Sequence, residues 1–279
     1  MREHPEFVRL ARDHQWDLHA ILEPAGDVWR CRGAAPVSTA YSDAHHAERD
    51  EALTSSWWYR TRNAMLLDLL DAGPRPVAIW DVGAGTGSVS RTLVAAGIPS
   101  IAVEPSPEGA RFAAAHGLTA VVGTLHDLEL PDASVRAVGL FDVLEHVADR
   151  PALLADIRRV LRPDGALYLS VPAGVWLWSG FDADEGHALR YSRARLLHEL
   201  QLADFVVERV VHAFALLVVP IALGRALPYR LELNRVVDHE RAVRASGGLL
   251  GALLGALERR LVGRVPFGSS LLAVARRAT

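Results

Sequence analysis

The pattern of apolar and polar positions changes twice along the chain. Residues 1 to about 40 show no sustained period and are interrupted by prolines and glycines. Between residues 42 and 72, leucines and aromatic residues recur every three to four positions, which predicts a helix that ends at Gly73-Pro74. From residue 77 onward, short apolar runs alternate with amphipathic segments of about ten residues. This alternation predicts a mostly parallel sheet with helices on both faces.

Seven apolar runs are the expected strands: VAIWDV, SIAVEP, TAVVG, VRAVGLFDVL, ALYLSVP, FVVERVV and GSSLLAVARR. The stretch AGVWLWSGFDADEGHALRYS, after the fifth run, is predicted to be a loop. An apolar, helix-prone segment separates the last two runs. We therefore expect an α/β protein with a doubly wound, seven-stranded sheet. Its expected parts are an N-terminal segment with a helical lid, a core, a helical insertion and the last strand of the core, at residues 1–73, 74–211, 212–264 and 265–279.

Composition restricts the function more than the fold. A length of 279 residues suits one large α/β domain, with or without an insertion, and the net charge of −3 gives no nucleic-acid footprint. Cys31 is the only cysteine, which excludes an intramolecular disulfide and a thiolate zinc site within one chain. Residues 1–17 are charged and lack the apolar core of a secretory signal, so we expect a cytoplasmic protein.

The chain contains no lysine, and all 30 of its basic residues are arginine. The arginine- and alanine-rich composition is typical of a GC-rich genome. Whatever the cause, the absence excludes a P-loop lysine, a Schiff-base lysine and a lysine general base.

The turn after the first expected strand, in WDVGAGTGSVS, contains three glycines within five positions. Glycines at a strand-to-helix turn allow a ligand to approach the backbone closely, although such a turn is often only a tight connection. Glu104 at the end of the second expected strand adds a carboxylate that can accept hydrogen bonds from ribose hydroxyls. The third glycine comes one residue earlier than in the dinucleotide pattern G-x-G-x-x-G, so the loop favours a nucleoside that carries an amino acid.

Four stretches, in order along residues 77–172, resemble the class I S-adenosylmethionine-dependent methyltransferases: WDVGAGTGSVSRTL, VEPSPEGARFA, GTLHDLELPDASVRAVGLFDVLEHV and LLADIRRVLRPDGALYLSVP. The resemblance implies a cofactor site around the ends of the first, second and fourth strands. Its implied members are Asp81, Gly83, Ala84, Gly85, Gly87, Glu104, Pro105, Thr124, Leu125, Phe141 and Asp142. Many relatives carry an acid at the position of Thr124, so the polar adenine contact falls to its hydroxyl, to Asp127, or to neither.

Two looser matches indicate a small-molecule subgroup of the quinone, sugar or secondary-metabolite type. ALTSSWWYRTRNAMLLDLL resembles a helix that precedes the cofactor domain in such enzymes, and WSGFDADEGHALRYSRARL resembles a segment that follows their fifth strand. The first implies a lid in which Arg60 or Arg62 reaches the cofactor carboxylate. Structural packing is the competing interpretation of both segments. The expected acceptor-binding side chains are Trp58, Tyr59, Trp176, Trp178 and Tyr191.

Methyl transfer to a hydroxyl group needs a base, and histidine is the natural one near neutral pH. His146 follows the fourth strand and His187 lies in the segment after the fifth, so both are candidates, with a structural role as the alternative for each. The pair His45-His46 is expected to be a solvated helix start rather than a metal site, and no metal is expected.

The apolar run FALLVVPIALGRALPYRL, residues 214–231, is broken by Pro220, Gly224 and Arg225 and is too short for a clean membrane span. An acceptor cap or dimer surface, interfacial docking to a membrane, and plain core packing all remain open for it.

Together these features predict an S-adenosylmethionine-dependent methyltransferase that acts on a bulky, partly apolar small molecule, most readily at a hydroxyl oxygen. N- or C-methylation and a non-methylating cyclase or binding protein are alternatives. A nicotinamide-dependent oxidoreductase is disfavoured because its usual Tyr-x-x-x-Lys pair needs a lysine. We expect no nucleic-acid partner and no membrane span. A homodimer and a peripheral membrane contact are the alternatives left open.

Overall fold

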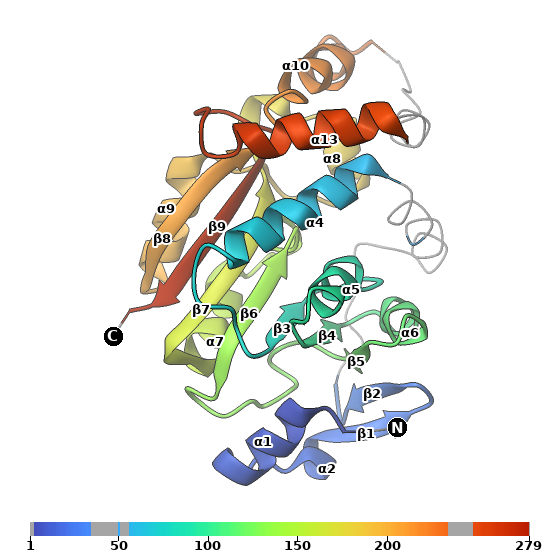
Figure 1. Ribbon diagram of the computed structural model, residues 1–279, viewed down its shortest axis with the longest axis vertical. Coiled ribbons are helices and arrows are strands. Elements are labelled where there is room, and N and C mark those ends of the chain that lie inside the picture. The colour runs from blue at the N-terminus through green and yellow to red at the C-terminus, as the bar shows by residue number, and fades with distance from the viewer. Residues whose placement is uncertain (1–2, 35–49, 51–55, 234–247, 279) are drawn as a thin grey trace.

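A computed structural model describes residues 3–34, 50, 56–233 and 248–278. One nine-stranded sheet runs through the molecule in the order β1-β2-β5-β4-β3-β6-β7-β9-β8. Helices lie on its two faces, and the N-terminal elements are at the opposite end of the molecule from α10 and α13 (Figure 1). This is the doubly wound α/β architecture that the alternating pattern predicts.

The centre of the sheet is parallel and forms the main core. Its strands are β3 (Ile79–Val82), β4 (Ser100–Glu104), β5 (Thr119–Val122), β6 (Val135–Phe141) and β7 (Leu161–Pro172). These strands are apolar and buried along almost their whole length because helices cover both faces. The helices that connect them are α5 (Ser88–Ala95), α6 (Pro107–Ala115) and α7 (Arg150–Val160).

The carboxy-terminal side of the sheet is antiparallel. There β9 (Ser270–Arg277) pairs with both β7 and β8 (Phe205–Ala213), and α9 (Arg193–Leu202) precedes β8. The expected loop after β7 contains a short 3₁₀ turn, η2 (Val175–Leu177), and a short helix, α8 (Gly180–Asp184). Between β8 and β9 the chain forms α10 (Val218–Ile221), the π-helical turn η3 (Ala222–Ala226), α11 (Leu227–Arg230) and α13 (Leu249–Leu261).

The N-terminal part of the chain differs from the expectation in two ways. Residues 5–31, for which no helix or strand was predicted, form α1 (Pro5–His14), α2 (Leu18–Ile21) and a hairpin of β1 (Leu22–Ala25) and β2 (Val28–Cys31). The sheet consequently has nine strands rather than seven, since β2 pairs in parallel with β5. Four-residue strands are too short to show a period, and Pro24 within β1 disguises it further. A proline is tolerated there because β1 is an edge strand.

Helix α4 (Trp57–Leu70) crosses the molecule beside α13 (Figure 1). Ser56 caps its first turn by accepting a hydrogen bond from the backbone N–H of Trp58. On its inner face, the buried Asn63 side chain donates to the hydroxyl of Thr92 on α5 at 2.9 Å. The expected helix thus exists from residue 57, and the expected first part, at residues 42–49 and 51–55, lies outside the described residues.

The strand order places a topological switch next to β3. From β3 the chain builds β4 and β5 on one side and then crosses to β6 and β7 on the other. Open α/β sheets bind ligands beyond the carboxyl ends of strands at such a switch. The residues that follow β3, β4 and β6 are therefore the first place to look for a functional site.

Candidate cofactor and acceptor site

The glycine loop, residues 83–87, connects β3 to α5. Its three glycines all have positive φ, at 73° for Gly83, 57° for Gly85 and 83° for Gly87. A Cβ atom on Gly83 would lie 2.6 Å from Val143, and one on Gly87 would collide with Leu118. A Cβ on Gly85 would meet nothing within 4 Å. Gly83 and Gly87 thus allow the loop to pack closely against Val143 and Leu118, whereas the side of the loop at Gly85 is open.

We predict that Gly87→Ala and Gly85→Ala have different effects on stability. The first adds a left-handed alanine and a clash with Leu118 and Ala113, so it should lower the free energy of unfolding by about 2–4 kcal/mol. The second adds only the left-handed alanine, at about 1–2 kcal/mol. Denaturant unfolding of the two variants checks this, and equal losses would contradict the assignment of Gly87 to packing.

Glu104 ends β4 and is tied to the glycine loop. One carboxylate oxygen accepts a hydrogen bond from the backbone N–H of Gly85, and the other accepts one from Ser106, both at 2.8 Å. Burial raises the pKa of this carboxyl, while the two backbone donors oppose that rise. Pro105 follows directly in the turn into α6. The sequence-predicted acid therefore lies beside Gly85, the glycine whose side of the loop is open.

Asp81 lies within β3, beneath the glycine loop, and its side chain is buried. The hydroxyl of Ser90 on α5 donates to its carboxylate at 2.7 Å, and Ser100 on β4 lies 2.8 Å from that same hydroxyl. Burial raises the pKa of Asp81 to about 6. Asp81 thus connects β3, α5 and β4 under the loop, which is a different placement from the expected lining of the cofactor.

The raised pKa of Asp81 predicts that the stability of the protein depends on pH. Between its ordinary value of 3.8 and about 6, the folded protein binds more protons than the unfolded chain, so this group lowers stability as pH rises through that window. Asp81→Asn keeps a partner for Ser90 and removes the charge. We expect the free energy of unfolding of the variant to exceed that of the wild type by about 2–3 kcal/mol at pH 8. At pH 3.5 the two free energies of unfolding should be nearly equal. Urea unfolding at the two pH values measures it, and a gain independent of pH would refute the explanation.

The loop after β5 carries the residues expected near adenine. Thr124 donates to Asp127 from its backbone N–H at 2.8 Å and from its hydroxyl at 2.6 Å, so these two residues act as one turn. Leu125 packs in the main hydrophobic core and is 1 % exposed. Its side chain therefore does not lie on an open face, contrary to the expected adenine contact. The Thr124 hydroxyl is already paired with Asp127, so the Asp127 carboxylate is the acceptor that we retain as the candidate for the adenine contact.

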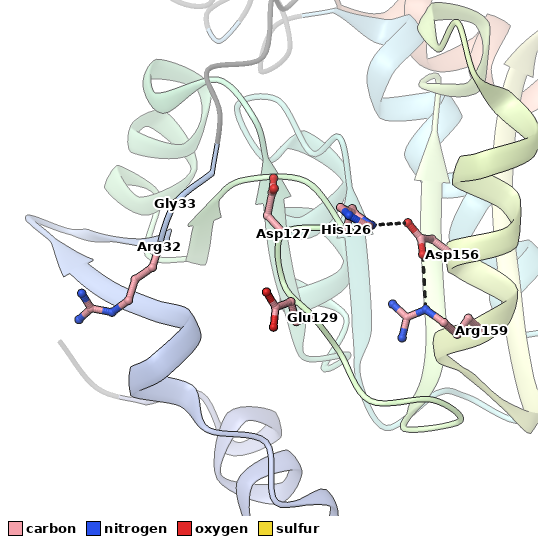
Figure 2. Close-up of a pocket in the computed structure, with 7 residues that line it drawn as sticks. All are labelled: Arg32, Gly33, His126, Asp127, Glu129, Asp156 and Arg159. Carbon is pink, nitrogen blue, oxygen red and sulfur yellow. Dashed lines mark hydrogen bonds and ion pairs between the residues drawn. The ribbon is translucent and has the colours of Figure 1, made fainter.

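A surface pocket of about 530 Å³ lies beside the same loop, between the end of β2 and α7 (Figure 2). Its lining is charged, and within it Asp156 accepts hydrogen bonds from His126 and Arg159. Of the residues predicted for either ligand, it contains only Asp127. It lacks the glycine loop and both candidate bases, so we do not assign the site to it.

On the other side of the switch, the end of β6 is joined to α4. Asp142 adopts a left-handed backbone conformation, with φ of 56°, and its carboxylate pairs with the buried Arg62 and accepts a hydrogen bond from Ser170 on β7. The guanidinium of Arg62 lies 5.4 Å from the ring centres of both Trp58 and Tyr59. The structure therefore places Arg62 at the strand ends and Arg60 on the exposed side of α4.

The aromatic residues near the end of β6 differ in their surroundings: Trp58 and Tyr59 lie on α4, whereas the ring of Phe141 lies in the core. Trp58 stacks on Phe214 with ring centres 5.2 Å apart, so α4 meets the chain that leaves β8. The ring of Phe141 packs over Gly139 in the core, which leaves only the backbone of Phe141 at the tip of β6. Both Trp58 and Tyr59 are half-buried.

Beyond β6 and β7, four residues form what we call the acid–histidine cluster: Glu145, His146, Asp182 and His187. Asp182 is fully buried and accepts a hydrogen bond from Nδ1 of His187 at 3.0 Å and from Nε of Arg190 at 2.6 Å. The His146 and His187 rings are 4.9 Å apart. Burial acts to raise the pKa of Asp182, but the hydrogen bonds from His187 and Arg190 hold it below its ordinary value.

The two histidines that the sequence singles out are thus brought together, although 41 positions separate them in the chain. When His187 donates Nδ1–H to the Asp182 carboxylate, its Nε2 atom is the ring nitrogen left to act as a base. Sequence reasoning missed Asp182 as the partner of His187, because a separation of five positions outside a predicted helix does not indicate a contact.

Glu145 was also missed. It is fully buried, and within the described part of the chain neither carboxylate oxygen has a hydrogen-bond partner. Burial, and then the nearby Asp142, raise its pKa well above the ordinary value, which favours the protonated acid. Glu145, His146 and His187 offer ligand atoms within 4.8 Å of one another, a spacing at which a cation could also be held. A buried acid without a partner costs stability, which is typical of a functional site.

The expected acceptor-binding residues after β7 fare differently. Trp176 is 51 % exposed and Trp178 is half-buried, so both remain candidates. Tyr191 was wrongly assigned: it is fully buried in the main core, and its hydroxyl donates to Glu199 at 3.0 Å. Aromatic residues near a site are often core residues, and the sequence alone does not separate the two. His45 and His46 lie outside the described residues.

The fold and the loops at its switch point define a class: a doubly wound α/β protein with a glycine loop after β3 and an acid at the end of β4. Comparison with known proteins gives the family. Residues 80–169 match the family described as "Methyltransferase domain". Residues 80–169 are thus a methyltransferase domain, and it is similar to those of the class I S-adenosylmethionine-dependent enzymes.

Two curated relatives cover different lengths of the chain. A 37.1 kDa protein in transposon TN4556 of Streptomyces fradiae is 31 % identical over 234 residues, which are 81 % of this chain and 62 % of that protein. A ubiquinone biosynthesis O-methyltransferase of Xanthomonas oryzae is 30 % identical over 153 residues, which are 47 % of this chain and 63 % of that enzyme. The chain thus spans less than two thirds of the length of each.

A solved structure agrees on the fold. The methyltransferase in a complex with the Haloferax volcanii Trm112 activator superposes with a TM-score of 0.57 at 24 % identity, over 85 % of this chain and 96 % of that one.

Proposed function

We propose that this protein transfers a methyl group from S-adenosylmethionine to a hydroxyl oxygen of a bulky, partly apolar small molecule. The observation that carries the proposal is the Asp182–His187 pair, a histidine oriented by a buried carboxylate just beyond the β6–β7 ends. Such a pair presents a base with a defined tautomer.

The residues at the ends of β3 and β4 fit the cofactor. Gly85 leaves an open side of the loop, and the Glu104 carboxylate lies beside it with both oxygens still able to accept further hydrogen bonds. Glu104 would hold the ribose hydroxyls, the glycine loop would lie against the nucleoside and amino-acid parts, and Asp127 would face the adenine amino group. When bound, S-adenosylmethionine supplies an activated methyl group on its sulfonium.

The acid–histidine cluster would act on the acceptor. His187 takes the hydroxyl proton on Nε2, and Asp182 stabilises the resulting imidazolium through Nδ1–H. Arg190 holds Asp182 in place and keeps it charged. The aromatic faces of Trp58 and Tyr59, beside Arg62, would bound the reaction space from α4.

The Xanthomonas oryzae relative supports oxygen as the accepting atom, because its name describes an O-methyltransferase. Transfer to nitrogen would not need the oriented base in the same way, since an amine with a free lone pair attacks without prior deprotonation. We therefore rank the hydroxyl acceptor first.

The experiment is a product assay on the purified protein. It is incubated with S-adenosylmethionine and separate panels of catechols, aliphatic alcohols and amines, and formation of S-adenosylhomocysteine is followed by mass spectrometry. The proposal expects acceptor-dependent product with a phenol-type or alcohol panel. Cofactor binding without product in the hydroxyl panels, together with product in the amine panel, would overturn the acceptor assignment.

A further inference from the structure

Helix α13 presents its leucines to the outside. Leu249, Leu250, Leu253 and Leu257 are 78, 63, 60 and 45 % exposed, and at helical spacing they occupy one face. The opposite face of α13 carries glycine, and this allows close contact with α4: a Cβ on Gly255 would collide with Thr61 of α4. The helix therefore packs inward through its glycines and leaves its apolar face without a described partner.

The helical stretch from α10 to α11 repeats this arrangement. Val219, Leu223 and Leu227 recur every four residues and are 61, 64 and 46 % exposed, and Tyr229 and Leu231 continue the apolar surface. Figure 1 places α10 and α13 at the same end of the molecule. This many exposed large apolar side chains at one end of a protein usually mark an interaction site. We call these two helical faces the leucine surface.

Positive charges predominate among the described residues of the segments that carry the leucine surface. Residues 214–233 and 248–267 contain five arginines and two acidic residues, whereas the whole chain has a net charge of −3. One of the two acids, Glu258, points inward and accepts hydrogen bonds from the backbone N–H groups of Ala215 and Leu216. Arg230, Arg260 and Arg264 are exposed near the leucines. An otherwise acidic protein thus has a basic, apolar end.

We propose that the leucine surface docks on an anionic lipid membrane. Exposed apolar helix faces bordered by arginine bind at the headgroup boundary, with the arginines facing anionic headgroups. A second copy of this chain fits less well, because an isologous contact would bring the basic ends together. In the described part of the chain no helix is long and apolar enough to cross a bilayer, so the contact would be peripheral. This inference does not depend on methyl transfer.

The test is flotation of the full-length protein with vesicles of phosphatidylglycerol and phosphatidylcholine, compared with pure phosphatidylcholine. We expect the protein to bind the anionic vesicles and to bind the neutral ones at least tenfold more weakly. Salt at about 0.5 M should weaken binding to the anionic vesicles, because it screens the attraction between the arginines and the headgroups. Leu253→Glu should lower anionic-vesicle binding at least tenfold, and the double change Arg260→Gln with Arg264→Gln should lower it while leaving the thermal midpoint unchanged.

A matched control uses Val8→Glu on α1, a similarly exposed apolar residue at the far end of the molecule. It should bind vesicles like the wild type. The proposal is overturned if the wild type fails to float with anionic vesicles, or if Leu253→Glu and Val8→Glu behave alike. It is also overturned if Leu253→Glu instead abolishes a concentration-dependent dimer, seen by sedimentation, without changing vesicle binding.

Discussion

Replacing Glu104 by alanine is expected to weaken S-adenosylmethionine binding at least a hundredfold. Two hydrogen bonds from ribose hydroxyls to a carboxylate contribute about 1.5–3 kcal/mol each, and each 1.4 kcal/mol is a factor of about ten in affinity. The substitution also leaves the N–H groups of Gly85 and Ser106 without their present acceptor, which loosens the glycine loop. Isothermal titration calorimetry with the cofactor and with S-adenosylhomocysteine measures the loss.

Two further variants separate the direct contact from the loss of loop order. Glu104→Gln retains an acceptor for one backbone N–H and should weaken binding less than alanine does. Glu108→Ala removes a half-buried acid four residues away, whose described ion pair is with Arg111 on the same helix, and this variant should bind the cofactor normally. Unchanged cofactor affinity in Glu104→Ala would refute the ribose role and with it the proposed cofactor site.

Replacing His187 by alanine is expected to lower turnover about 10²–10⁴-fold, which is the usual contribution of a positioned general base. Cofactor affinity should stay within about twofold of the wild type, because His187 lies beyond the β6–β7 ends rather than at the glycine loop. Single-turnover kinetics with saturating cofactor measures this. His198→Ala, on the exposed side of α9, is the control and should retain full turnover.

Asp182 is a positioning residue in this scheme, and its variant tests the pair. Asp182→Asn removes the carboxylate that fixes the His187 tautomer and pairs with Arg190, so the alkaline-side turnover should fall and the pH profile should change its shape. A merely structural role would lower stability without altering that profile. If the His187→Ala variant has normal turnover, His187 is not the base.

The same kinetic assay with a chelator distinguishes proton transfer from metal chemistry in the acid–histidine cluster. Glu145, His146 and His187 are close enough to share a cation, but a sulfonium donor needs no Lewis acid to release its methyl group. We therefore expect turnover to persist in the chelator within about twofold. Loss of turnover that added divalent metal restores would replace the base assignment with a metal site.

Local patterns predicted the central sheet well because its strands are buried on both faces and three of them, β3, β4 and β6, are followed by helices of 8 to 11 residues. The same local reasoning failed at β1 and β2, whose four-residue strands are shorter than any period that could reveal them. It failed at Tyr191 as well, since an aromatic residue beside a site and one beneath it have the same sequence signature. Both errors concern contacts with residues far away in the chain.

The sequence by itself determined the class of fold, the position of the glycine loop, the downstream acid at Glu104 and the two histidines worth testing. All of these depend on short-range spacing, and backbone geometry translates such spacing directly into structure. Only the tertiary structure decided that Gly83 and Gly87 serve packing while Gly85 leaves an open side, that Arg62 rather than Arg60 meets Asp142, and that Asp182 orients His187. It also showed that the leucines of α13 face outward. These facts depend on which elements pack together, and the free energy of that packing is a property of the whole chain.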